Sequence, residues 1–205
     1  MHISDGILPI SYCIAGFAGA AGLTAYELKN TKNREIPSVA VMGAAFFAAS
    51  LIHFKIGVTS VHLTLLGLTA LILGRKAILA ILSGLFFQAV LFQHGGISTL
   101  GVNALVMMIP ALLCQWGFRV LTTKRREKSA YVAIIAGFIT FLTVILATML
   151  AATVLLLSGE GFLGIAALFT ISNSALALVE GFITGIVVSR LLKIKPEMIH
   201  SWKPA

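Results

Sequence analysis

The chain has 205 residues, of which 59% are hydrophobic and only 11% are charged, and its mean hydropathy is +1.02. Soluble globular domains carry about a quarter charged residues, so this composition excludes that class and indicates an integral membrane protein. The formal net charge of +8 does not by itself indicate a nucleic-acid partner, because the cytoplasmic loops of membrane proteins collect Lys and Arg.

The apolar residues come in runs of about twenty, which favours spanning helices over a β-barrel. Runs bounded by charges or turn residues predict an all-α bundle of seven transmembrane helices, at about 7–28, 37–54, 56–74, 77–93, 104–121, 130–158 and 161–192. No linker separates them, so residues 1–205 are predicted to form a single transmembrane domain. The first apolar run has no basic stretch before it and no cleavage site after it, which predicts a mature chain beginning at or very near Met1.

The positive charges distinguish the two sides of the predicted bundle. With seven spans, all Lys and Arg residues except Lys55 fall in the loops of one side. The other side holds Lys55 with two carboxylates, Asp5 and Glu160. By the positive-inside rule, this asymmetry predicts an N-terminus outside the cell and a C-terminus in the cytoplasm.

The same topology sorts the five histidines. His200 falls in the cytoplasm, whereas the outer face receives His2, His53, His62 and His94. Imidazole is the commonest transition-metal ligand, so this grouping suggests capture of a metal ion from outside. His53 lies beside the cation Lys55, which disfavours metal binding, and it is expected to be interfacial.

An N-terminus that reads Met1-His2 is a chelator in itself. The Met1 amine, the amide nitrogen between the two residues and the near nitrogen of the His2 ring can bind one metal through fused five- and six-membered rings. A fourth nitrogen from a distant histidine would complete a square-planar N4 site, a geometry typical of Ni(II) or Cu(II) rather than tetrahedral Zn(II). The alternative is a solvated histidine behind an ordinary start residue.

His62 is a second candidate functional residue. It lies about six residues into the predicted 56–74 helix, hence about 9 Å below the outer end of that helix at 1.5 Å per residue. A polar side chain at such depth is costly and is a functional candidate by default. The alternative is a ring that is hydrogen-bonded to Thr59, Ser60 or Thr64.

The longest predicted outer loop runs from His94 to Asn103. Its glycines, Gly95 and Gly96, permit positive φ and a close approach of the backbone, so we expect the loop to cover a bound ion. Three roles remain open for His94: a direct ligand, a partner that orients another ring, or a simple turn residue.

Glu180 is an acidic residue in the interior of an apolar run, where an isolated carboxylate is expensive. We expect it to make a structural link to Asn173 or to a partner subunit, because no second carboxylate is available to relay protons.

Small residues recur at four-residue spacing in 7–28 and predict a face for close helix contact; the pairs are Ala15 with Gly19, Gly16 with Ala20, and Ala18 with Gly22. The sequence contains no P-loop, no HExxH motif and no nucleophile with a nearby base, so the chain is not expected to be an enzyme or to hydrolyse ATP.

Four segments together resemble the NikM/CbiM proteins, the substrate-binding (S) components of nickel and cobalt energy-coupling-factor (ECF) transporters: Met1–Pro9, Val61–Leu63, Leu91–Asn103 and Val179–Gly181. The resemblance runs along essentially the whole chain. It implies seven helices in a prokaryotic cell membrane, with the N-terminus tucked into the bundle. It also implies partners on other chains: a transmembrane coupling (T) subunit, two cytoplasmic ATPase subunits and a small auxiliary membrane subunit. The small-residue face of 7–28 is the expected contact with the coupling subunit.

The resemblance also implies a metal site. The family's ligands carry over to Met1 through its amine, His2 through its amide and ring nitrogens, and His62 through its ring. A retained Met1 is implied, because a second residue as large as His2 normally blocks its removal. The cover over the site is expected to comprise His94, Gly95, Gly96, Ser98 and Asn103.

The identity of the metal rests on the residues around His62. Cobalt members tend to read Cys-Ser-His-Pro-Thr-Gly there, whereas the segment 59–64 of this chain reads Thr-Ser-Val-His-Leu-Thr, which looks like the nickel type. The resemblance therefore favours Ni(II) as the imported ion, with Co(II) as the alternative. Two further hypotheses stay open: a metal-free structural subunit of a membrane complex, and a copper importer, since N4 sites suit Cu(II).

Overall fold

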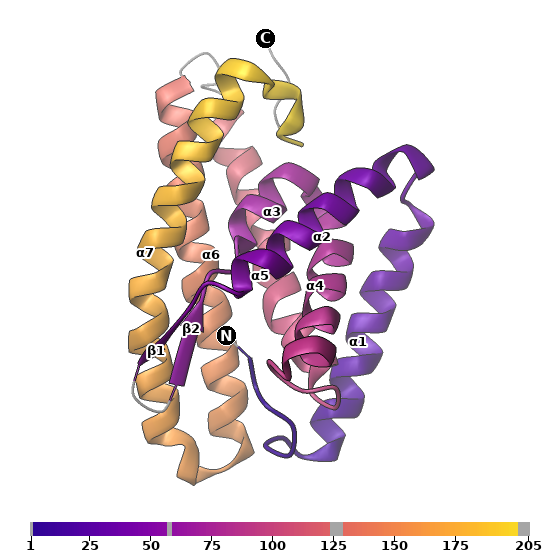
Figure 1. The fold of residues 1–205 in the computed structure, drawn as a ribbon, viewed down its shortest axis with the longest axis vertical. Helices are drawn as coiled ribbons and strands as arrows, with labels where there is room; N and C mark the ends of the chain where they lie inside the picture. The colour runs from indigo at the N-terminus through magenta and orange to yellow at the C-terminus, as the bar shows by residue number, and fades with distance from the viewer. Residues whose placement is uncertain (1, 57–58, 124–128, 201–205) are drawn as a thin grey trace.

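The computed structural model describes residues 2–56, 59–123 and 129–200, with the backbone alone described at 54–56, 59–60 and 160. The described chain consists almost entirely of helices, with one short β-hairpin (Figure 1). The helices are α1 (Ile10–Lys29), α2 (Ile36–Ser50), α3 (Leu66–Leu73), α4 (Ala77–Phe92), α5 (Leu100–Thr122), α6 (Ser129–Ser158) and α7 (Leu163–Ile194). The strands are β1 (His53–Ile56) and β2 (Thr59–His62), and short 3-10 turns are η1 (Asn33–Glu35), η2 (Gly74–Lys76), η3 (Glu160–Phe162) and η4 (Pro196–Met198).

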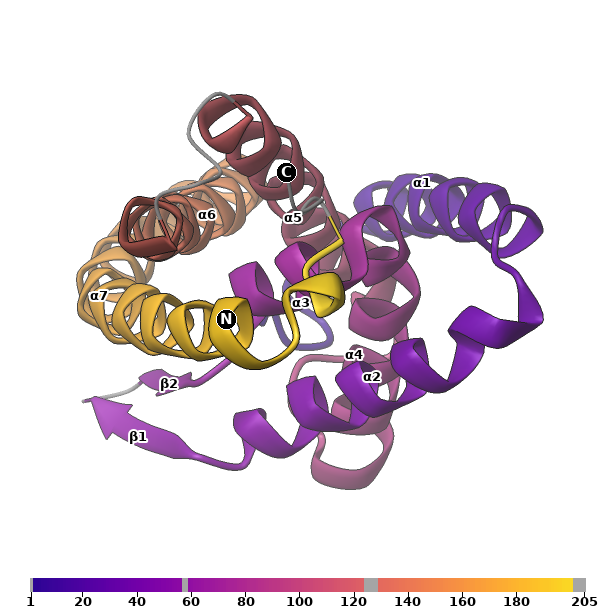
Figure 2. The ribbon, with the colours of Figure 1, turned by 90° about the horizontal axis from the view of Figure 1, so that it is seen from above.

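The short helix α3 lies at the centre of the bundle. Figure 2 shows α6 and α7 on one side of it, with α1, α2 and α4 on the other. Seven of its eight residues are buried, and it contacts α2, α4, α5, α6 and α7. A helix surrounded in this way needs no polar face, which explains why its sequence is apolar all round.

The third predicted span, 56–74, is wrong as a continuous helix. The chain there forms β1 and β2, which pair antiparallel with His53 opposite His62, and it becomes helical only at the start of α3. The depth of about 9 Å inferred for His62 therefore does not hold, because that residue lies on a strand. The physical reason is the side chains of this segment, since β-branched residues favour extended backbone over helix; these are Ile56, Thr59 and Val61.

The other six predicted helices are found close to their predicted bounds. Four helical stretches of the described chain are long and apolar enough to cross a membrane: Leu66–Phe92, Leu100–Thr122, Ser129–Ser158 and Leu163–Ile194. The first joins α3, η2 and α4, although Gly74 at φ +61° interrupts the helical geometry between α3 and α4. A largely α-helical membrane fold is confirmed, whereas the β-hairpin departs from the all-α prediction, and the seven spans and the orientation of the termini remain predictions.

Helix α1 crosses α5 where two glycines let the backbones meet. A Cβ on Gly16 would lie 2.6 Å from the backbone nitrogen of Val102, and a Cβ on Gly101 would lie 2.3 Å from the backbone nitrogen of Phe17. Only glycine permits this approach. The predicted small-residue face is therefore used partly inside this chain: Gly16 and Ala20 are buried, whereas Ala15, Ala18 and Gly22 are exposed.

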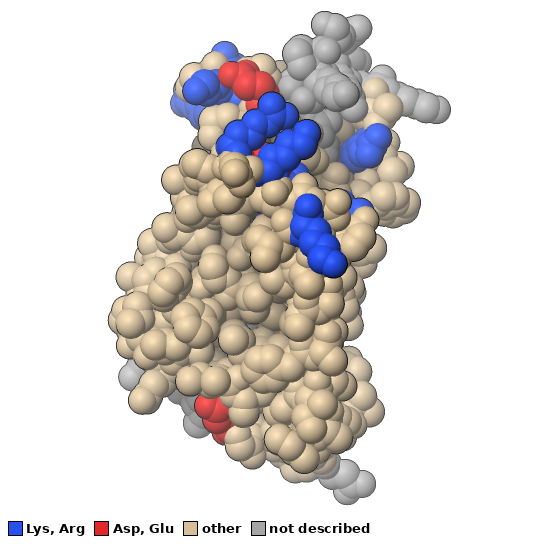
Figure 3. Space-filling model, turned by 90° about the vertical axis from the view of Figure 1, so that its right-hand side faces the viewer, with Lys and Arg blue, Asp and Glu red and all other residues tan. Residues whose placement is uncertain are grey.

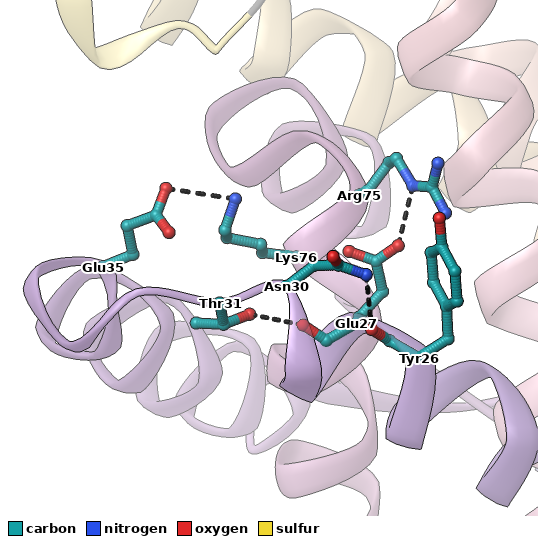
Figure 4. Close-up of polar contacts among 7 residues, drawn as sticks. All are labelled: Tyr26, Glu27, Asn30, Thr31, Glu35, Arg75 and Lys76. Atoms are coloured by element: carbon teal, nitrogen blue, oxygen red, sulfur yellow. Dashed lines mark hydrogen bonds and ion pairs between the residues drawn. The ribbon is translucent and has the colours of Figure 1, made fainter.

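The described cations gather at one end of the molecule. In Figure 3, Lys and Arg side chains cluster at the end where α7 finishes, and the middle of that face carries no charged side chain. Two ion pairs at this end tie α1 and η1 to η2 (Figure 4). Arg75 Nε donates to the buried Glu27 carboxylate at 2.7 Å, with its guanidinium 5.0 Å from the ring centre of Tyr26, and Lys76 Nζ lies 3.1 Å from Glu35 Oε1. The loop between α4 and α5 lies toward the other end (Figure 1).

Candidate metal centre

The segment ahead of α1 leads from the start of that helix toward the middle of the molecule (Figure 1). Its Ile3 is clamped by Asn103 of α5, because Ile3 N donates to Asn103 Oδ1 and Asn103 Nδ2 donates to Ile3 O, both at 2.9 Å. The Thr99 hydroxyl donates to the same carbonyl at 2.7 Å. Asn103 and Thr99 are both buried, so water does not compete for these bonds. The clamp fixes the backbone next to His2.

The loop between α4 and α5 contacts the same N-terminal segment through Asp5. Ser98 donates to Asp5 Oδ1 from its backbone N–H at 2.9 Å and from its hydroxyl, and Ile97 N donates to Oδ2 at 3.2 Å. Gly96 lies so close that a Cβ there would be 2.0 Å from Asp5 Oδ1. Gly95 takes φ +80°, and its Cβ would lie 3.2 Å from His2 Cβ. The predicted cover loop therefore packs directly on residues 2–5.

Three imidazole rings meet beneath this loop. The ring centres of His2 and His62 lie 4.8 Å apart with an interplanar angle of 23°, and those of His62 and His94 lie 6.2 Å apart at 8°. The fourth predicted outer histidine, His53, is exposed, and its ring contacts His94 edge-on at 5.9 Å. The structure thus brings together all three histidines named for the site, from the N-terminal segment, β2 and the α4–α5 loop.

His62 is oriented by its own backbone and by α7. Its Nδ1 lies 3.1 Å from the carbonyl oxygen of Leu63, which makes Nδ1 the protonated nitrogen and Nε2 the one with the lone pair. Two residues further on, Thr64 donates to the buried carboxylate of Glu180 from its backbone N–H and, at 2.7 Å, from its hydroxyl. Glu180 therefore binds Thr64 rather than Asn173, whose Nδ2 donates to Phe169 O.

Burial shifts the pKa of two rings of the candidate centre, those of His2 and His94. It lowers the pKa of His2 well below its ordinary value, and the neighbouring His62 and His94 add to the shift. It also lowers the pKa of His94, with a further contribution from His53. Both rings are therefore neutral at pH 7, which is the form that binds a metal.

The rings face a cavity of about 370 Å³. Its walls include His2, His62 and His94 together with apolar residues of α6 and α7. Among the described residues, no group of three or more His, Cys, Asp or Glu side chains is arranged to hold a metal ion. The predicted donor set does not need such a group, because only two of its four nitrogens belong to side chains. Met1, which supplies the amine, lies outside the described residues.

Several residues that shape the centre were not predicted from the sequence. Asp5, Thr64 and Thr99 supply the bonds described above, and Gln88 of α4 is a fully buried amide whose side chain interacts with the His2 ring. Of these residues, Gln88 could have been found from the sequence by its polarity. It is an amide in an otherwise apolar stretch of the predicted 77–93 helix, and buried polar groups need a hydrogen-bond partner or a functional role.

Comparison with known proteins assigns this chain to a family. A family model described as "CbiM: Cobalt uptake substrate-specific transmembrane region" matches residues 2–198. The chain belongs to the CbiM family. A CbiM-family relative, "Cobalt transport protein CbiM" of Thermosediminibacter oceani, is 32% identical over 221 residues, covering 94% of this chain and 89% of that protein. A protein of Haemophilus influenzae, named "Putative metal transport protein", is 34% identical over 203 residues, covering 98% of this chain and 97% of that protein.

The fold of this CbiM-family chain also matches a solved structure. The crystal structure of a truncated transition metal transporter superposes with a TM-score of 0.78 at 25% identity, covering 94% of this chain and 99% of that chain. The chain is therefore a substrate-specific membrane component of cobalt or transition-metal transport, not a catalytic enzyme, and it is a multi-pass protein of the prokaryotic plasma membrane.

Proposed function

We propose that this CbiM-family chain captures Ni(II) at the outer face of the membrane through a square-planar N4 site, as the S component of an ECF-type importer. The four donors are the Met1 amine, the Met1–His2 amide nitrogen, His2 Nδ1 and His62 Nε2. The metal is the transported substrate and not a resident cofactor.

One observation carries this proposal: the ring centres of His2 and His62 lie 4.8 Å apart. In the chelate, His62 occupies the position next to His2 Nδ1. With metal–nitrogen distances of about 2 Å, two neighbouring imidazoles in a square plane have ring centres about 4.5 Å apart, against about 6 Å for opposite ones. The observed separation therefore suits adjacent ligands on one metal.

The protonation pattern supports the same donor set. The Nδ1 contact of His62 with the Leu63 carbonyl leaves the lone pair on Nε2. Low basicity of the buried His2 ring favours a bound metal over a bound proton at neutral pH. The ring of His94 lies 6.2 Å from that of His62, which is too far for a neighbouring ligand. The position opposite His62 is already taken by the Met1–His2 amide nitrogen in the proposed chelate, so His94 is assigned to the cover.

Cobalt is the second candidate substrate, because the matching family model and the Thermosediminibacter oceani relative both carry cobalt in their names. Nickel is preferred here on chemical grounds: four strong nitrogen donors in one plane suit d⁸ Ni(II), and the residues around His62 look like the nickel type.

The proposed orientation puts the N-terminus and the metal centre outside and the C-terminus in the cytoplasm, with seven spans. It is supported by the cations gathered at the end where α7 finishes (Figure 3) and by the position of the α4–α5 loop toward the other end (Figure 1), as the positive-inside rule requires. Transport then depends on a transmembrane coupling subunit, two cytoplasmic ATPase subunits and a small auxiliary membrane subunit. The exposed part of the α1 small-residue face, at Ala15, Ala18 and Gly22, is the proposed contact with the coupling subunit.

Blocking the N-terminal amine tests the chelate. Purified wild-type protein and a form whose Met1 amine is acetylated are titrated with Ni(II), Co(II) and Cu(II) under the same conditions. The proposal predicts tight binding by the wild type, Ni(II) preferred over Co(II), and loss of binding in the acetylated form because the amine can no longer donate a lone pair. Unchanged affinity in the acetylated form would refute the chelate, and absence of binding by the wild type would favour a metal-free structural subunit. Import of copper rather than nickel by metal-limited cells would reassign the substrate.

A further inference from the structure

Gln88 of α4 is a fully buried amide next to the metal centre. It is 0% exposed, and its side chain interacts with the His2 ring. Within the described chain, however, neither its amide oxygen nor its amide nitrogen makes a hydrogen bond of ordinary geometry, and neither does either ring nitrogen of His2. Two buried polar groups thus lie together with their hydrogen-bonding capacity unused.

Such an arrangement is unusual, because most buried polar side-chain atoms in proteins have a partner. A leucine of similar size would suit this stretch of α4, where Leu85 and Ala89 are also buried. Packing alone therefore does not explain why residue 88 carries a polar amide.

Metal binding by His2 would explain the amide at this position. A neutral imidazole that binds a metal through Nδ1 carries its proton on Nε2 and needs an acceptor for it. In metal sites this outer nitrogen almost always donates to a carboxylate, a carbonyl or water, which fixes both tautomer and ring orientation. The Gln88 side chain, which interacts with the His2 ring, carries such a carbonyl acceptor and is fully buried, where bulk water is excluded.

The backbone of Gln88 adds a second link. Its carbonyl oxygen accepts a hydrogen bond from His94 N at 3.1 Å, at the point where Gln93 turns the chain into the cover loop with φ +53°. The same residue of α4 thus contacts a predicted ligand with its side chain and the cover loop with its backbone.

We propose that Gln88 is a positioning residue of the metal site: its side-chain oxygen accepts a hydrogen bond from His2 Nε2 when His2 Nδ1 binds the metal. This inference rests on the proposed function. Beyond that function, the inference assigns a role to Gln88: it selects the tautomer of His2 and so influences the affinity of the chelate for the metal, without itself contacting the ion.

Three variants test the role. Gln88→Leu removes the acceptor while keeping a side chain of similar size, and Gln88→Glu restores an acceptor oxygen at the same position. Gln115→Leu on α5 makes the same chemical change outside the metal centre and serves as the matched control. Affinity for Ni(II) and the visible absorption of bound Ni(II) are measured on full-length protein, together with the melting temperature without metal.

We expect Gln88→Leu to lower the affinity for Ni(II) by about 10–100-fold, the usual effect of losing such an outer partner, and to alter the visible spectrum. Gln88→Glu is expected to recover most of the affinity, and Gln115→Leu to bind like the wild type. Wild-type affinity and spectrum in Gln88→Leu would overturn the inference. Equal losses in Gln88→Leu and Gln88→Glu, matched by equal falls in melting temperature, would also overturn it, because they would indicate packing.

The same series separates this inference from the proposed function. Wild-type protein and the form with an acetylated Met1 amine are titrated alongside the variants. If the wild type binds Ni(II) and the acetylated form does not, the chelate stands, and the Gln88 variants then decide the inference by themselves. If the acetylated form binds as well as the wild type, the chelate fails, and the inference falls with it.

Discussion

The imidazole rings of His2 and His62 stack with their centres 4.8 Å apart, although one belongs to the segment before α1 and the other to strand β2. Both are supported by bonds from other elements: Asn103 and Thr99 hold Ile3 next to His2, and Glu180 holds Thr64 close to His62. The candidate metal centre therefore depends on α5 and α7 as well as on its proposed ligands.

Substitution of the two ring ligands should remove tight binding. His2→Ala and His62→Ala each delete one of four donors, and we expect at least about a 100-fold loss of Ni(II) affinity, more than the 10–100-fold typical of an outer partner. Equilibrium titration of purified protein measures this loss. His53→Ala and His200→Ala are the matched controls and should stay close to wild type. Wild-type binding by His62→Ala would make His94 the better fourth ligand.

The clamp on Ile3 should be needed for both stability and binding. Asn103→Leu leaves the buried N–H and carbonyl of Ile3 without their amide partner, and an unsatisfied buried group costs about 1–3 kcal/mol. We expect a lower free energy of unfolding and weaker metal binding, measured by thermal melting and by titration. Asn30→Ala removes a comparable but exposed bond, from Asn30 Nδ2 to Tyr26 O at 2.8 Å, and should change stability by less than about 0.5 kcal/mol. Equal effects of both variants would contradict a special role for the clamp.

Gly96 should not tolerate a side chain. In Gly96→Ala the new methyl group would lie 2.0 Å from Asp5 Oδ1, so either Asp5 or the loop must move, and the cover would open. Faster dissociation of bound Ni(II), followed by exchange into a chelator, is the expected result. Gly164→Ala in α7 is the control, because a Cβ there meets nothing within 4 Å and alanine is favoured in a helix. Dissociation at the wild-type rate from Gly96→Ala would show that the contact does not hold the cover.

The contact between Asp5 and the loop should weaken only in acid. The Ser98 hydroxyl and the backbone N–H groups of Ser98 and Ile97 lower the pKa of Asp5 below its ordinary value, so the ionised form is favoured in the folded protein. The resulting stabilisation is fully present above the unfolded pKa of about 3.9 and is lost as the pH falls through the lower folded value. Melting temperatures of wild type and Asp5→Asn without metal should therefore differ at pH 7 and converge below about pH 4. A constant difference over this range would exclude the ionised contact.

Two substitutions of Glu180 distinguish a structural role, through its contact with Thr64, from a role in proton coupling. Glu180→Gln keeps an acceptor oxygen for Thr64 and should retain most Ni(II) affinity and uptake. Glu180→Ala leaves the Thr64 N–H buried without its acceptor, at a cost of about 1–3 kcal/mol, and should displace β2 with His62. Ni(II) binding and uptake by cells that contain the partner subunits measure both effects. Normal binding with abolished uptake in Glu180→Gln would instead indicate that the carboxylate itself is needed during transport.

Much of the fold could be predicted from the sequence because membrane helices are specified by local composition. The bounds of α5, α6 and α7 differ from their predicted spans by a few residues, since about twenty apolar residues in a row leave little choice of structure. The 56–74 span failed for a different reason. Its hydropathy is that of a helix, but its β-branched residues favour strands, and the hairpin became stable only through the partner strand and through Glu180 of α7.

For the candidate site, the sequence alone predicted the types of donor and the side of the membrane: a chelating Met1-His2, an outer group of histidines, and cations confined to the opposite loops. These features depend on neighbouring residues or on sums of charge along the chain, so they can be inferred from the sequence without knowing the fold. Only the tertiary structure decided which histidines meet, that Asn103 clamps Ile3, that Glu180 binds Thr64, and that Gln88 lies against His2. Each of these contacts joins residues far apart in the chain, and hydropathy carries no information about which helix faces meet.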